Sequence, residues 1–169
     1  MSDLKIFSND IPVHGKRIIV RLDLNVPINN SIIDDDTRIK VVEPFINKLI
    51  ENKAKVILLS HLGRPKGKVV SKLSLRPIFN YLEKKLNGKV YFYQEIIDSK
   101  AIDASNKLKP GEVLLFENIR FFKEEENDDE TFAKNLSGLG DIYINEAFSC
   151  SHRKQASMHK ITKFIDSYG

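Results

Sequence analysis

Short apolar runs rich in β-branched and aromatic residues recur five times along this chain of 169 residues. The runs cover residues 17–22, 55–59, 89–93, 112–116 and 141–144, and helical patterns separate several of them. Their apolar residues are contiguous rather than alternating, which is typical of strands buried on both faces of a parallel sheet. This order of elements predicts one α/β domain, a three-layer αβα arrangement around a mainly parallel, Rossmann-like sheet.

Three segments between these runs carry apolar residues at helical spacing. The first has them at positions 39, 42, 46, 49 and 50, and Pro44 lies inside it, so we expect a kink or a late helix start there. The second, residues 75–86, has Ser74 as its N-cap candidate and a stop signal at residues 87–88. The third starts near Asp128 or Asp129, and the acidic run at 124–130 before it is expected to be a solvated loop.

Composition narrows the class of protein. The single cysteine, Cys150, excludes an intramolecular disulfide and fits a reducing compartment. No apolar run approaches the roughly 18 residues of a membrane span, and the first residues lack a signal-peptide core, so we expect a cytoplasmic protein without a membrane partner. The excess of 27 basic over 23 acidic residues is mild, and no nucleic-acid partner is expected. The histidines and Cys150 do not have zinc-site spacing, so no metal is expected.

Polar and charged residues follow the ends of the predicted strands and open the first helix. In an open parallel sheet, ligands bind beyond the carboxyl ends of the strands, so these residues are expected to converge. The candidate binding residues are Asp23, Asn25, Arg38, His61, Arg64, Arg120 and Arg153. Guanidinium groups suit phosphate and carboxylate, whereas an aspartate would accept a hydrogen bond from a hydroxyl. These residues alone predict a small ligand with a phosphate, a hydroxyl and a second anionic group.

Other phosphate-binding motifs do not fit. Residues 63–69, GRPKGKV, have one residue too few between the glycines for a P-loop, and Val69 replaces the required Ser or Thr. Gly138 and Gly140 precede a predicted strand instead of following one, which excludes a dinucleotide fingerprint. Cys150 and His152 are too close in sequence to favour a thiol nucleophile.

Five motifs together resemble phosphoglycerate kinase, in order and spacing from about residue 17 to 158. They are RLDLNVP at 21–27, DDTRI at 35–39, SHLGRPKG at 60–67, LFENIRF at 115–121, and NEAF at 145–148 followed by His152 and Arg153. This family is a two-lobed glycolytic enzyme that moves a phosphoryl group between 1,3-bisphosphoglycerate and ADP with magnesium. The resemblance implies that residues 1–169 are its N-terminal substrate-binding domain, truncated before the interdomain helix and the C-terminal nucleotide lobe.

The resemblance also implies a role for each candidate residue. Arg64, Arg120 and Arg153, with His61, would hold the phosphate of 3-phosphoglycerate. Arg38 would be catalytic at the carboxyl end of the substrate, and Asp23 and Asn25 would bind its hydroxyl side. Mg-ATP or ADP would bind the missing lobe, so we expect this chain alone to be a monomer with no cofactor and no turnover.

Three positions depart from the family pattern: Glu146 replaces an Asp, Gln155 a His, and Ile119 a frequent Thr. Two other functions remain open from the sequence. A free-standing, non-catalytic anion-binding module would use the same residues. A nucleic-acid binder would need a basic stripe with interleaved aromatic residues, which this sequence lacks.

Overall fold

A computed structural model describes residues 5–169 as an αβα domain built on one six-stranded parallel sheet. The strand order is β5-β6-β4-β1-β7-β8, and every neighbouring pair runs parallel. The strands are β1 (Arg17–Arg21), β4 (Lys55–Leu59), β5 (Val90–Tyr93), β6 (Val113–Phe116), β7 (Ile142–Asn145) and β8 (Asp166–Tyr168). Two short strands, β2 (Ile28–Asn29) and β3 (Ile32–Ile33), form a separate antiparallel hairpin.

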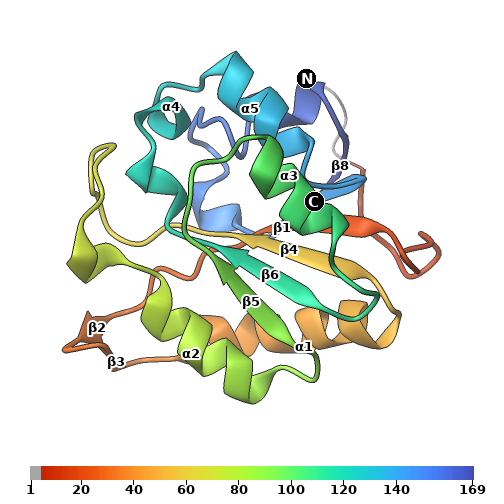
Figure 1. Ribbon diagram of the computed structural model, residues 1–169, viewed down its shortest axis with the longest axis horizontal. Coiled ribbons are helices and arrows are strands. Elements are labelled where there is room, and N and C mark those ends of the chain that lie inside the picture. The colour runs from red at the N-terminus through yellow and green to blue at the C-terminus, as the bar shows by residue number, and fades with distance from the viewer. Residues whose placement is uncertain (1–4) are drawn as a thin grey trace.

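Helices cover both faces of the sheet, as Figure 1 shows. One face carries α1 (Thr37–Glu51) and α2 (Arg76–Lys85), and the other carries α3 (Ser99–Asn106), α4 (Lys123–Glu126) and α5 (Glu130–Ser137). The described residues also contain four short 3₁₀ turns: η1 (Ser71–Leu73), η2 (Ile119–Phe121), η3 (Phe148–Cys150) and η4 (Lys160–Lys163). The predicted three-layer α/β fold is confirmed.

The strands are buried on both faces, which explains their contiguous apolar residues. In β1, Ile18 and Val20 pack in the cluster beneath α1 and α2, whereas Ile19 packs in the cluster beneath α3 and α5. The side chains of β4 are divided between the same two clusters, because successive side chains of a strand point to opposite faces. Two apolar cores therefore hold β1 and β4 rigidly at the centre of the sheet.

Three local expectations need correction. Helix α1 begins at Thr37 and continues through Pro44, so the late start is wrong. Leu75, not Ser74, is the N-cap residue of α2, although Ser74 Oγ accepts a hydrogen bond from the Arg76 N–H at 3.1 Å. The acidic run is not a solvated loop throughout, because residues 123–126 form α4 and Glu125 is fully buried.

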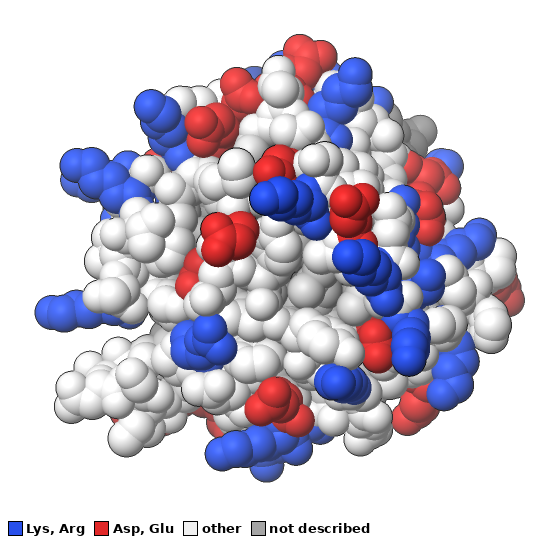
Figure 2. Space-filling model, in the orientation of Figure 1, with Lys and Arg blue, Asp and Glu red and all other residues white. Residues whose placement is uncertain are grey.

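Asp129, at the end of the acidic run, is the N-cap of α5 and accepts a hydrogen bond from the Phe132 N–H at 2.7 Å. This confirms the predicted start of that helix. Within residues 5–169, none of the helices has both the length and the apolar character that crossing a membrane requires. On the face shown in Figure 2, lysines and arginines are interspersed with aspartates and glutamates.

Candidate anion-binding site

A pocket of about 260 Å³ lies where the strands of the sheet end, and all seven candidate binding residues line it. Gly63, Ser149 and Cys150 complete the lining. The lining carries four arginines and one aspartate, a formal excess of three positive charges when His61 is neutral. Such a pocket suits a small anion, because guanidinium groups bind phosphate and carboxylate oxygens in pairs.

Asp23, just beyond β1, is the one carboxylate in this lining. It accepts hydrogen bonds from the Asn25 N–H at 3.1 Å and from Ser149 Oγ at 2.5 Å. Arg38 Nη1 lies 2.9 and 2.8 Å from its two carboxylate oxygens. Burial alone would raise the pKa of Asp23, but the bonds from Ser149 and Asn25 and the charge of Arg38 together lower it. Asp23 is therefore ionised and orients Arg38 across the pocket.

The loop after β4, which contains His61 and Arg64, is fixed by its neighbours. The Gly63 N–H donates to Asn25 Oδ1 at 3.1 Å, and Asn118 Nδ2 donates to the Leu62 carbonyl at 2.7 Å. Gly67 has a φ of +73°, and a Cβ there would lie 2.5 Å from Lys123 Cβ. Glycine is required at this position both for its backbone conformation and for the close approach of α4.

The four arginines differ in exposure. Arg120 is 3% exposed, its Nη1 donates to the Gly63 carbonyl at 3.1 Å, and its buried Nε has no hydrogen-bond partner. Burial lowers the pKa of Arg120, and the charges of Arg21 and Arg153 lower it further. Arg38, Arg64 and Arg153 are exposed. A buried guanidinium nitrogen without a partner is costly, so the pocket favours an anion that approaches Arg120.

His61 is 2% exposed and lies behind the arginines. Its Nδ1 is 3.1 Å from Arg21 Nη2, and its Nε2 is 3.9 Å from Cys150 Sγ. Burial lowers the pKa of His61 to about 3, with the charges of Arg21 and Arg120 as the next causes. The imidazole is therefore neutral near pH 7. His152, the second histidine on this edge, is exposed and does not line the pocket.

Sequence reasoning missed Ser149, Cys150 and Arg21. Ser149 and Cys150 lie in η3, directly before the predicted Arg153, but neither residue type by itself indicated a site. Arg21 is fully buried behind the pocket, and its Nη1 donates to the Leu22 carbonyl at 2.5 Å. An arginine that directly follows the buried apolar residues 18–20 was the signal that could have found it.

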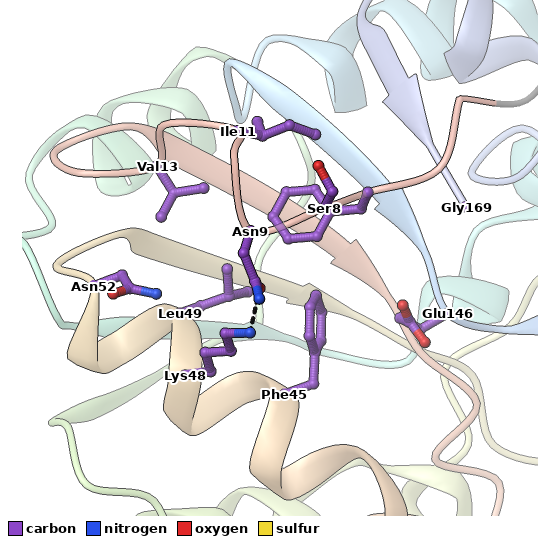
Figure 3. Close-up of a pocket in the computed structure, with 11 residues that line it drawn as sticks. Ser8, Asn9, Ile11, Val13, Phe45, Lys48, Leu49, Asn52, Glu146 and Gly169 are labelled. Carbon is purple, nitrogen blue, oxygen red and sulfur yellow. Dashed lines mark hydrogen bonds between the residues drawn. The ribbon is translucent and has the colours of Figure 1, made fainter.

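The three residues that depart from the family pattern do not line this pocket. Ile119 is fully buried in the core beneath α3 and α5. Gln155 is 5% exposed and its buried Oε1 has no hydrogen-bond partner. Glu146 lines a different pocket of about 250 Å³, shown in Figure 3, where Phe45 and Leu49 of α1 face the segment that follows Phe7. Burial raises the pKa of Glu146.

Among residues 5–169, no cluster of three or more histidine, cysteine, aspartate or glutamate side chains has the arrangement of a metal site. The fold and the pocket together define an α/β domain with a cationic pocket at the carboxyl edge of a parallel sheet, where ligands bind in such folds. Residues 8–169 match the phosphoglycerate kinase family, and the chain belongs to that family.

Curated and solved relatives agree with this assignment. The phosphoglycerate kinase of Prochlorococcus marinus is 47% identical over 98% of this chain and 42% of its own length. That of Finegoldia magna is 46% identical over 94% of this chain and 40% of its own length. The structure of the Coxiella burnetii enzyme superposes with a TM-score of 0.84 at 39% identity, covering 94% of this chain and 39% of the other. The chain thus spans about two fifths of the length of these relatives.

Proposed function

We propose that this chain is the 3-phosphoglycerate-binding, N-terminal domain of a phosphoglycerate kinase. The whole protein would transfer a phosphoryl group between ATP and 3-phosphoglycerate, forming ADP and 1,3-bisphosphoglycerate. The observation that carries the proposal is the excess of three positive charges in the pocket. A phosphorylated hydroxy-carboxylate offers the phosphate, carboxylate and hydroxyl that this lining can bind.

Each candidate residue has a role in this proposal, and His61 joins three of the arginines in binding the phosphate. Arg64, Arg120 and Arg153 bind the distant phosphate, which does not react. Arg38 lies towards the carboxylate and stabilises the charge on the phosphoryl group during its transfer. An interaction that is strongest in the transition state accelerates the reaction. Asp23 and Asn25 bind the hydroxyl, and Asp23 also holds Arg38 at 2.8 Å until the ligand enters.

The nucleotide would bind outside this chain. We infer that the C-terminal lobe of the whole protein holds Mg-ATP or ADP, and that the domain alone binds phosphoglycerate without turnover. A monomeric cytoplasmic protein without a nucleic-acid partner fits this role. The interspersed charges on the face in Figure 2 support the absence of a nucleic-acid partner, since a nucleic-acid surface would concentrate basic residues.

Calorimetric titration of the chain tests the proposal. We expect 3-phosphoglycerate to bind and Mg-ATP to show no binding at the same concentration and salt. Arg76 provides a matched control, because it is an exposed arginine outside the pocket. Arg76→Ala should bind 3-phosphoglycerate as the wild type does. Comparable affinity for both compounds would contradict the proposal. A whole protein that binds 3-phosphoglycerate but transfers no phosphoryl group would favour the non-catalytic module.

A further inference from the structure

A chain of buried polar side chains connects α4 with the pocket. Glu125, Ser157 and Arg21 are fully buried, and none of the three lines the pocket. Glu125 accepts hydrogen bonds from the Ser157 N–H at 2.9 Å and from the Ser157 hydroxyl. The same hydroxyl accepts from Arg21 Nε at 2.9 Å, and Arg21 Nη2 lies 3.1 Å from His61 Nδ1.

The partners of His61 decide which ring nitrogen carries its hydrogen. A guanidinium group has five N–H donors and no acceptor. Arg21 Nη2 can therefore bond to His61 Nδ1 only when Nδ1 has a free lone pair. In a neutral imidazole the hydrogen is then on Nε2, the nitrogen nearer to Cys150 in the pocket lining.

We propose that Arg21, held by Ser157 and Glu125, is a positioning residue that fixes His61 as the neutral Nε2–H tautomer. The pocket then presents a hydrogen-bond donor at His61 in place of a lone pair that would repel an anion. This inference deepens the proposed function, on which it rests for the identity of the anion as a phosphate ester.

The surroundings of His61 oppose a second proton on the ring. Among the charges, Arg21 on β1 and Arg120 on η2 disfavour the imidazolium most. Asp23 favours it more weakly than either of these disfavours it, and Arg153 after η3 adds a smaller unfavourable effect. Cys150 is the remaining titratable group beside the ring. Burial acts in the same direction as the arginines, and the pKa of about 3 reflects the sum. Affinity for a doubly charged anion should therefore lack a histidine titration step between about pH 5.5 and 8.

Nitrogen-15 NMR of the ligand-free chain tests the tautomer directly. The chain has four histidines, and loss of a signal in His61→Asn assigns the ring of interest. We expect an unprotonated signal at Nδ1, a protonated signal at Nε2, and no titration between about pH 5.5 and 8. A scalar coupling from Arg21 Nη2–H to His61 Nδ1 should report their hydrogen bond. A hydrogen on Nδ1, or an ordinary titration, would overturn the inference.

This measurement uses no ligand, so its failure is separate from failure of the proposed function, which the titration with 3-phosphoglycerate reports. A paired variant tests the role of Arg21. Removing one buried charge leaves its counterpart unpaired, so Arg21→Met is combined with Glu125→Gln. Arg17→Met is the control, since Arg17 lies at the other end of β1 and binds Asp141 and Ser105 instead.

In the paired variant we expect both tautomers of His61 and a raised pKa, whereas the control keeps the wild-type spectrum. Sulfate, which stays doubly charged over this range, should then bind the paired variant more tightly at lower pH. The gain is up to about tenfold for each unit by which sulfate raises the pKa of His61. A folded paired variant with the single Nε2–H tautomer would overturn the role of Arg21. If this variant does not fold, the scalar coupling between Arg21 and His61 in the wild type tests the role of Arg21. Absence of that coupling would overturn the inference.

Discussion

Acidification should destabilise this domain through His61. Folding places the ring in a site that is 2% exposed beside two arginines, which lowers its pKa from 6.5 to about 3. Between these values the unfolded chain binds a proton that the folded chain does not, so the stability contributed above pH 6.5 is lost as the pH falls. From these two pKa values, linkage gives a loss of about 2 kcal/mol between pH 8 and pH 5.

Urea unfolding at these two pH values measures the effect. We compare the wild type with His61→Asn, in which Asn Oδ1 can still accept from Arg21 but does not titrate. The wild type should lose about 2 kcal/mol more than this variant on acidification, because the other titrating groups contribute to both chains. His14 is exposed, so His14→Asn should follow the wild type. Equal losses in the wild type and His61→Asn would refute a buried, neutral His61.

Four further predictions concern the pocket and its supporting loop. Arg64→Ala should weaken 3-phosphoglycerate binding by about 1.5–3 kcal/mol in calorimetry, the range for a hydrogen bond to a charged group, and Arg38→Ala should weaken it less. In the whole enzyme, Arg38→Ala should nearly abolish kcat while Arg64→Ala mainly raises KM; intact turnover in Arg38→Ala would contradict its catalytic role. Sulfate should raise the melting temperature more than chloride does at equal ionic strength. At a hundredfold excess of sulfate over its Kd, the free energy of unfolding should rise by about 2.7 kcal/mol. Equal shifts in melting temperature would indicate general screening without a site. Gly67→Ala should lower the free energy of unfolding by about 1 kcal/mol or more, because its φ is +73° and the new Cβ would meet Lys123; unchanged stability in a urea titration would show that the loop can move.

Five of the strands and three of the helices could be predicted because burial dictates their residue types. Helix α3 was missed. It has only eight residues, and its first turn is stabilised by Asp98, which accepts hydrogen bonds from the Lys100 and Ala101 N–H groups. Strand β8 was missed because Asp166–Tyr168 contains no apolar run and owes its form to pairing with β7. Contacts between distant segments determine β8, and a local pattern cannot reveal it.

The site was predictable to the extent that chain order determines it. Parallel strands end at one edge, so residues that follow different strands converge whatever lies between them. The direction of a buried side chain could not be predicted in this way. Arg21 belongs to a motif already noted in the sequence, yet its side chain turns inwards because Ser157, 136 residues away, accepts its hydrogen bond and is itself held by Glu125. Glu125 likewise looked like one of several solvated acidic residues until Ser157 was placed against it.

The place of β1 in the sheet has a consequence for synthesis of the protein. β1 leaves the ribosome before the other described strands of the sheet, yet Ile18 pairs with Val56 on one side and with Ile142 on the other. The second partner is 124 residues later, which corresponds to roughly 6–25 s of translation at about 5–20 residues per second. During that time one edge of the central strand remains unpaired, with apolar residues on both faces. Growing chains of this domain should therefore depend on chaperone protection until β7 emerges.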